Sequence, residues 1–277
     1  MIYDTHCHLN IVRETSLGKY DCKPSTNDDV KSIIQRAKES NISYLMQAGC
    51  YLNEIEREIE ICEKFSDKDI TIVCGLANHP ENVKETGVVS VDEIVKIANQ
   101  SKYIKAIGET GLDTHRPENY EFLEQQRKSF ENHIFAGIQL NLPIIVHAYG
   151  EDAIKRSIDM VESIFKNTHF KFVFHCYDGT YEQAKKIVDC GGIISFSGTI
   201  TFKKKTIARE ILSNIPLDNI VIETDSPFLA PEPFRGKENE PSLIKYTAQY
   251  ASEYLGLDYE EFCNKTKENS LKLFNQQ

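Results

Sequence analysis

The sequence has no excess of positive charge. It carries 42 acidic residues against 32 lysines and arginines, a formal net charge of −10 over 277 residues. A surface of this sign repels polyanions at long range, which excludes proteins that coat duplex DNA by neutralising its phosphates. A nucleic-acid or phosphate substrate would therefore need a local concentration of positive charge, supplied by basic side chains or by metal ions.

Paired cysteine motifs and long apolar runs are also missing. The eight cysteines are scattered and form no C-x-x-C pair, a pattern that favours a reducing compartment over a disulfide scaffold. No run approaches the length of a membrane span, and the N-terminus has no basic segment followed by an apolar core. We expect a cytoplasmic protein without a membrane partner, and no obligate protein partner is evident.

Eight apolar runs recur along the chain, separated by segments that carry helix signals. The runs cover residues 2–10, 42–48, 70–76, 103–107, 143–146, 170–174, 192–196 and 219–222. Asn27 can cap a helix whose apolar positions recur at i, i+3, i+4 and i+7, and two more helices are expected from about Ser242 and Asp258. The polar stretch 13–25, rich in glycine, proline and charge, predicts a loop.

This alternation predicts parallel strands joined by helical crossovers. A dinucleotide-binding sheet would place a G-x-G-x-x-G turn after the first strand, and none is present. Eight repeats at this length favour a closed (β/α)₈ TIM barrel over an open sheet. Because no low-complexity segment or linker divides the sequence, we expect one α/β domain over residues 1–277.

The first strand carries two histidines two positions apart. Side chains alternate along a strand, so Asp4, His6 and His8 project from one face, where two imidazoles can hold one cation. Two core histidines satisfied by backbone carbonyls are the plainer interpretation, and two imidazoles do not complete a metal site. If the pair binds a metal ion, further ligands are expected at the ends of the other strands.

Four further candidate ligands stand where later strands end, the position at which barrel enzymes carry their chemistry. They are Glu109, His147, His175 and Asp225. Each alone has an ordinary structural explanation, but six donors from five strands at one rim predict a metal site. Six ligands suit two divalent ions with Glu109 as the shared carboxylate, and mixed imidazole and carboxylate donors admit Zn²⁺, Mn²⁺ or Mg²⁺.

The segments around these residues resemble the signatures of the TatD family of metal-dependent deoxyribonucleases. The matching segments appear in the family's order and span nearly the whole chain: Asp-Thr-His-Cys-His-Leu at 4–9, Gly-Glu-Thr-Gly-Leu-Asp at 108–113, Leu-Pro-Ile-Ile-Val-His at 142–147, His-Cys-Tyr-Asp-Gly at 175–179, Glu-Thr-Asp-Ser-Pro-Phe-Leu-Ala-Pro at 223–231 and Arg-Gly-Lys-Glu-Asn-Glu-Pro at 235–241. Each segment is short, but the ordered set is highly specific.

The resemblance implies an amidohydrolase-like TIM barrel that cleaves DNA phosphodiesters, commonly as a 3′→5′ exonuclease on single strands. It implies one ion held by His6, His8, Glu109 and Asp225, and a second held by Glu109, His147 and His175. Asp225 would also act as general base, Glu109 would bridge the ions, and His79 would face the scissile phosphate. From its position after the eighth strand, Arg235 could bind a substrate phosphate, or it could belong to a solvated helix start. Asp113 is expected to brace its loop.

Three segments depart from the family pattern. Ala148-Tyr149-Gly150 stands where Ser-Arg-Asp is usual, so a basic side chain is missing; Tyr177-Asp178 replaces Phe-Ser; and the loop before His79 is longer. None touches an expected ligand, but all three lie in the surroundings that select the substrate. Two rival functions therefore remain. One is hydrolysis of an ester or amide on the same centre, for example D-aminoacyl-tRNA deacylation; the other is a non-catalytic metal-binding barrel.

Overall fold

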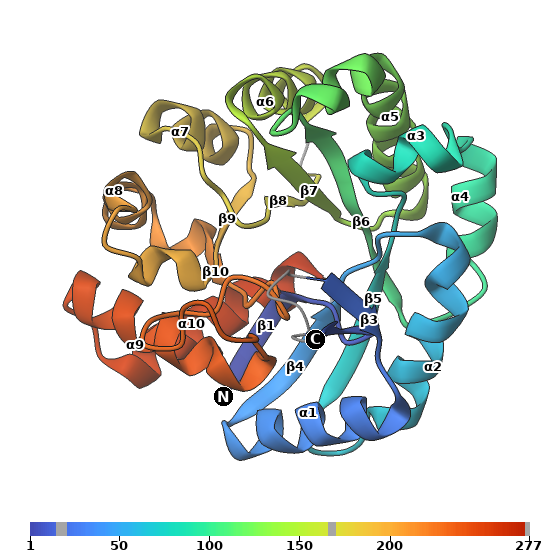
Figure 1. Cartoon of the computed structure of the whole chain (residues 1–277). Coiled ribbons are helices and arrows are strands. Elements are labelled where there is room, and N and C mark those ends of the chain that lie inside the picture. Colours follow the sequence, from blue (N-terminus) through green and yellow to red (C-terminus); the bar gives the residue numbers. More distant parts are fainter. Residues whose placement is uncertain (15–20, 166–169, 275–277) are drawn as a thin grey trace.

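The computed structural model describes residues 1–14, 21–165 and 170–274, and eight parallel strands form its main sheet. Their spatial order follows the chain: β1 (Ile2–Cys7), β4 (Ile42–Gln47), β5 (Thr71–Leu76), β6 (Ile104–Asp113), β7 (Ile144–Tyr149), β8 (Phe172–Phe174), β9 (Ile193–Phe196) and β10 (Ile220–Ile222). Figure 1 shows the strands surrounded by a ring of helices. The predicted (β/α)₈ barrel is confirmed.

Backbone contacts beyond the last strand join the two ends of the sheet. The amide of Asp225 donates to the carbonyl of His6 at 2.8 Å, and the amide of His8 donates to the carbonyl of Ser226 at 2.8 Å. Cys7 and Ser226 form a parallel bridge. These contacts bring β1 beside the segment that follows β10, so the first and last candidate ligands of the sequence become neighbours.

The helices lie between successive strands and after the last one. They are α1 (Asn27–Glu39), α2 (Ile55–Phe65), α3 (Val83–Thr86), α4 (Val91–Ala98), α5 (Leu123–Leu140), α6 (Glu151–Phe165), α7 (Tyr181–Asp189), α8 (Thr206–Asn214), α9 (Ile244–Leu255) and α10 (Tyr259–Leu273). Short 3₁₀ helices are η1 (Leu52–Glu54), η2 (Pro80–Asn82), η3 (Pro117–Phe122), η4 (Gly198–Thr201), η5 (Leu217–Asn219) and η6 (Pro241–Leu243). Among the described residues, no helix combines the length and apolar character that crossing a bilayer requires.

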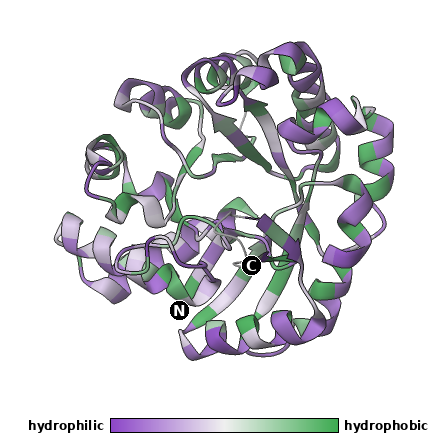
Figure 2. Ribbon diagram, viewed as in Figure 1, coloured by the Kyte–Doolittle hydropathy of each residue, from purple (hydrophilic) through white to green (hydrophobic). Residues whose placement is uncertain are grey.

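Two apolar clusters hold the barrel together. The larger one lies between the strands and the inward faces of the helices, whose outward faces are hydrophilic (Figure 2). The smaller one takes one residue from each of seven strands together with Leu273 and Phe274 at the end of α10. Its strand members are Tyr3, Met46, Val73, Ala106, Ile145, Val173 and Val221. Since strand residues alternate between two faces, this cluster fills the barrel interior.

Two local predictions near the N-terminus differ from the structure. Thr26, not Asn27, caps α1, because its hydroxyl accepts the Asp29 amide in a capping box. The segment 13–25 is not only loop: β2 (Ile11–Glu14) pairs antiparallel with β3 (Asp21–Pro24), while residues 15–20 lie outside the described residues. Each of these strands has only four residues, which is too short for an apolar alternation to be recognised in a polar segment.

Strands β6 and β7 run further than the predicted ranges 103–107 and 143–146. Two glycines, Gly108 and Gly111, interrupt the apolar pattern of β6, and such a break predicts the end of a strand. In the structure Gly111 pairs with His147 at a φ of +149°, and a Cβ there would lie 1.9 Å from the carbonyl oxygen of His147. Glycine therefore allows β6 to continue as a strand past Glu109, where a larger residue would push the chain away from β7.

The substitution Gly111→Ala should destabilise the fold by about 2–4 kcal/mol, because it adds a clash with the β7 backbone to an unfavourable φ. Urea unfolding measures the loss. Gly191→Ala is the matched control: its φ is +84°, but a Cβ there meets no atom within 4 Å. The control should lose only about 1 kcal/mol. Equal losses in the two variants would contradict the packing argument.

Candidate metal centre

The backbone brings the six expected ligands together at the C-terminal ends of the strands. His6 lies in β1 and His8 follows it; Glu109 lies in β6 and His147 in β7; His175 and Asp225 follow β8 and β10. All but His6 line one cavity of about 590 Å³, and His6 is completely buried behind it. The candidate ligands therefore meet in space, as their positions along the sequence predicted.

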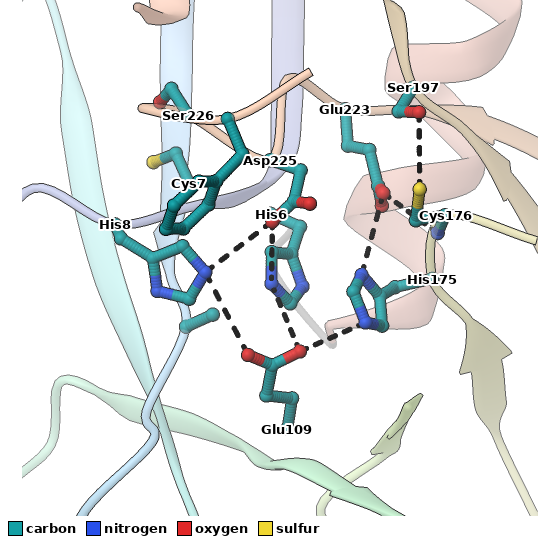
Figure 3. Close-up of polar contacts among 12 residues, drawn as sticks. His6, Cys7, His8, Glu109, His175, Cys176, Ser197, Glu223, Asp225 and Ser226 are labelled. Carbon is teal, nitrogen blue, oxygen red and sulfur yellow. Dashed lines mark hydrogen bonds and ion pairs between the residues drawn. The ribbon is translucent and has the colours of Figure 1, made fainter. Parts of the chain in front are cut away.

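Glu109 occupies the centre of this group. Its Oε2 atom lies 2.9 Å from Nε2 of His175, 3.4 Å from Nε2 of His6 and 3.5 Å from Nδ1 of His147. Its Oε1 atom lies 3.7 Å from Nε2 of His8. Figure 3 shows the carboxylate facing His8 on one side and His175 on the other. A carboxylate with two oxygens directed at different histidines has the geometry of a bridging ligand.

Asp225 completes the side of the centre formed by the first strand. Its Oδ1 atom lies 3.5 Å from Nε2 of His8 and 3.7 Å from Nε2 of His6 (Figure 3). These three residues form one compact set of donors able to hold an ion. The φ of Asp225 is +55°, a left-handed conformation that aspartate tolerates better than most residues. The turn after β10 thus directs a carboxylate back over β1.

The residue chemistry fits a metal ion. His6 is fully buried, and neither of its ring nitrogens has a hydrogen-bond partner within the described part of the chain. Burial, with the neighbouring His175, holds its pKa well below the usual value, so the ring is neutral. A buried neutral imidazole with unsatisfied nitrogens is costly unless a cation or another partner is bound.

His147 and His175 are each oriented by a second carboxylate. Nε2 of His147 lies 3.1 Å from Oδ2 of Asp113, which turns Nδ1 towards Glu109 and His175. Nδ1 of His175 lies 3.5 Å from Oε1 of Glu223. Burial lowers the pKa of His147, but the hydrogen bonds to Asp113 and Glu109 outweigh it and raise that pKa to about 9. Such carboxylate–histidine pairs commonly stand behind metal ligands.

Asp113 matches its expected bracing role and adds the contact to His147. Its Oδ1 atom accepts the His115 amide at 2.9 Å and the Asn119 side-chain amide at 3.0 Å. Asp4, grouped with the histidines by alternation, binds Thr224 instead: its carboxyl accepts the backbone amide at 2.9 Å and the hydroxyl at 2.6 Å. Asp4 thereby supports the turn that carries Asp225.

Glu223 and Cys50 are parts of the site that the sequence interpretation missed. Glu223 accepts the Cys176 amide at 2.7 Å and the Ser195 hydroxyl, which ties β9 and β10 to the His175 segment. Cys50 Sγ lies 3.2 Å from Oε1 of Glu109. Glu223 could have been found from the sequence, because it lies in the same motif as Asp225, two residues before it. Nothing in the sequence around Cys50 distinguishes it from the other scattered cysteines.

His79 reaches the centre from the segment after β5. Its Nδ1 atom accepts the Glu81 amide at 3.2 Å, so in the neutral ring the proton is on Nε2. Burial and the neighbouring His147 lower the pKa of His79 to about 3, which keeps the ring neutral. Nε2 lies 3.3 Å from Nδ1 of His147 and 3.9 Å from Oε1 of Glu109. His79 thus presents an N–H donor beside the candidate ligands.

Two basic residues stand at the cavity, and the expected Arg235 is not one of them. Arg116 and Lys205 line it, and Lys205 pairs with Asp178 at 2.6 Å. Arg235 is not among the lining residues; its guanidinium carbon lies 4.3 Å from the ring centroid of Phe202. Contact of Arg235 with a substrate phosphate stays a prediction.

These features define a class: α/β barrels with an imidazole- and carboxylate-rich metal centre at the mouth. A family model described as "TatD related DNase" matches residues 3–275. The chain belongs to this family, as its motifs indicated. Family membership and the donor set together support a metal-dependent hydrolase.

Individual relatives match over nearly their whole length. The chain is 33% identical over 277 residues to "Uncharacterized metal-dependent hydrolase YabD" of Bacillus subtilis, covering 99% of both chains. It is 32% identical to "Uncharacterized metal-dependent hydrolase YcfH" of Escherichia coli K12, covering 99% of this chain and 95% of that one. The crystal structure of the Escherichia coli TatD homolog YJJV superposes with a TM-score of 0.85 at 21% identity, covering 99% and 98% of the chains, and supports the fold.

His133 is a further supporting residue that the sequence did not single out. This fully buried histidine of α5 accepts the Asn78 amide on Nε2 at 3.1 Å, and its Nδ1 lies 2.7 Å from the Ser129 carbonyl oxygen. It thus holds the segment that carries His79. Burial lowers the pKa of His133 to about 4, so the ring stays neutral in the folded protein.

The unfolded chain binds a proton at His133 below pH 6.5, whereas the folded chain does so only near pH 4. Between these values the stabilising contribution should fall as the pH falls, by on the order of 3 kcal/mol in total. His133→Gln should therefore unfold with a weaker pH dependence over pH 4–6.5 in urea titrations. His115→Gln, at an exposed histidine, is the control. The same pH dependence in His133→Gln and wild type would contradict this role.

Proposed function

We propose that the chain hydrolyses phosphodiester bonds and acts as a deoxyribonuclease that removes nucleotides from the 3′ end of single-stranded DNA. The cofactor in this proposal is a pair of divalent ions, Mg²⁺, Mn²⁺ or Zn²⁺. The observation that carries it is the position of Glu109, whose two oxygens face separate histidines at the edge of an open cavity. Family membership supports the same reaction class.

The proposed ligand sets share Glu109, which contacts histidines of both sets. His6, His8 and Asp225 would hold one ion with Glu109, and His147 and His175 would hold the other with the same carboxylate. Divalent ions at this centre supply Lewis acidity and neutralise the charge of an anionic diester. This local positive charge answers the repulsion expected from a protein of net charge −10.

Three side chains have proposed parts in the reaction. Asp225 lines the cavity with a carboxylate that can orient an attacking water and accept its proton. Glu109 would be the ligand shared by both ion sites. His79 directs its Nε2–H towards the same region and would donate to a phosphate oxygen, a role consistent with its neutral ring.

The rim of the cavity supports one alternative substrate class. Three carboxylates, Glu54, Glu81 and Asp178, line it alongside the two basic residues Arg116 and Lys205. A rim with this balance does not strongly attract a polyanion, and it could accept the positively charged amino group of an aminoacyl ester. Hydrolysis of such an ester, as in D-aminoacyl-tRNA deacylation, is the second candidate function. A non-catalytic barrel is less well supported because the candidate ligands face an open cavity.

A degradation assay on single-stranded DNA labelled at its 3′ or 5′ end, with Mg²⁺, Mn²⁺ and Zn²⁺ in turn, tests the proposal. We expect mononucleotide release from the 3′ end that stops when the ions are chelated. Asp225→Asn should still bind at least one ion but turn over several hundred-fold more slowly, about the cost of removing a general base. Asp189→Asn, at an exposed carboxylate that does not line the cavity, is the matched control.

Two results would contradict these assignments. Wild-type rates in Asp225→Asn would remove its role as base. Inactivity on all DNA substrates, together with metal-dependent cleavage in a panel of esters and aminoacyl esters, would replace the nuclease by the alternative.

A further inference from the structure

An exposed pair of stacked rings lies at the rim of the metal-centre cavity. The rings of His115 and Tyr149 have centroids 4.1 Å apart and planes inclined by 20°. Both residues line the cavity, and Tyr149 keeps 42% of its surface exposed. The ring of Tyr149 is therefore accessible to a molecule in the cavity.

The strand register places the pair directly outward from the metal centre. Strands β6 and β7 lie side by side (Figure 1), and Tyr149, the last residue of β7, follows His147 by two residues and pairs with Asp113. Residues two apart on a strand share a face, so the Tyr149 ring lies on the face of β7 that carries His147, roughly 7 Å further along the strand. His115 lies two residues beyond the end of β6, and its ring stacks on that of Tyr149.

The backbone fixes this position. The amide of Thr114 donates to the carbonyl of Tyr149 at 2.8 Å, and the amide of His115 donates to Asp113 at 2.9 Å. Gly150 has a φ of +100°, and a Cβ there would lie 2.6 Å from Oγ1 of Thr114. Glycine thus lets the end of β7 approach the His115 segment closely. The stacked pair is therefore formed without a ligand.

An exposed aromatic ring beside a site for anionic groups suits a planar heterocycle. Nucleobases stack on aromatic side chains irrespective of sequence, because every base has a π-face. Arg116 follows His115 and also lines the cavity, so a cation stands beside the rings. A nucleotide could place its base on the ring of Tyr149 and direct its phosphate inward to the metal centre.

We propose that Tyr149, backed by His115, is the platform on which the terminal nucleobase of a single-stranded nucleic acid stacks. This inference rests on the proposed function, since it names how that substrate is held. It assigns recognition at the rim mainly to stacking rather than to charge. The platform should therefore tolerate all four bases.

The absence of tryptophan from the sequence gives a direct optical test. Tyr149→Trp creates a protein with a single tryptophan at the platform, and stacking of a base should quench its emission. With Mg²⁺ present, dAMP and dTMP should cause saturable quenching, whereas 2-deoxyribose 5-phosphate, which lacks a base, should not. Absence of quenching, or equal quenching by the sugar phosphate, would overturn the proposal.

Tyr254→Trp is the matched control. Tyr254 is 48% exposed and stacks on Tyr250 in α9, but it does not line the cavity. Its replacement should report no saturable quenching by dAMP. Quenching of equal strength in the control would show that nucleotides act on any exposed indole, and the platform would then be rejected.

Kinetics on single-stranded DNA separate the ring from the hydroxyl. Tyr149→Ala should raise KM by about 5- to 150-fold, the range that loss of one stacked base implies. Tyr149→Phe keeps the ring and should stay near the wild-type KM. An unchanged KM in Tyr149→Ala would contradict the proposal.

The two experiments also separate this inference from the proposed function. Quenching by nucleotides without DNA cleavage would retain the platform and reject the nuclease. DNA cleavage without quenching by nucleotides would retain the nuclease and reject the platform.

Discussion

The close approach of three strand ends determines where the central carboxylate stands. The amide of Glu109 in β6 donates to the carbonyl of Gly49 after β4 at 2.8 Å, passing over the end of β5. This crossing needs glycines: a Cβ on Gly49 would lie 2.7 Å from the oxygen of Gly75, and one on Gly75 would lie 2.3 Å from the oxygen of Gly108. Larger residues would separate the strand ends and withdraw Glu109 from the histidines.

The position of Glu109 also governs the electrostatics of the centre. Burial alone would raise its pKa, but the surrounding histidines, among them the charged His175 and the hydrogen-bonded His147, hold the pKa well below its usual value. The carboxylate is thus ionised although it is only 4% exposed. A buried anion surrounded by imidazoles, one of them without any hydrogen-bond partner among the described residues, is an environment that favours divalent cations.

Much of this arrangement could be predicted because every strand of the parallel barrel ends at the same rim. The position of a residue in the sequence therefore indicates where it lies on that rim. A histidine or acid directly after an apolar run lies at the C-terminal end of a strand, so His147, His175 and Asp225 could be assigned without coordinates. The end of β6 could not, since glycines that permit close approach look like strand terminators, and β7 continues past its apolar run to Tyr149. His133 and Glu223 were missed because their roles depend on contacts with distant segments, which local patterns do not encode.

The net negative charge of the protein disfavours an anionic substrate, whereas the groups that line the cavity favour one. The protein as a whole is acidic, yet its mouth combines a candidate cation-binding centre with two basic residues and exposed aromatic rings. Under the proposed function, a polyanionic substrate would be held there by concentrated charge and stacking, not by a broad basic surface. The departures from the family's motifs, Tyr149 and Asp178, both lie in this mouth, where they can change the substrate without disturbing the ligands.

The central claim is that Glu109 joins two ion sites. Anomalous diffraction from crystals grown with Mn²⁺ measures this most directly. The account predicts two peaks about 3.5–4 Å apart, one beside His6 and His8 and one beside His147 and His175, with Glu109 between them. A single peak, or peaks that leave Glu109 without a metal contact, would contradict it.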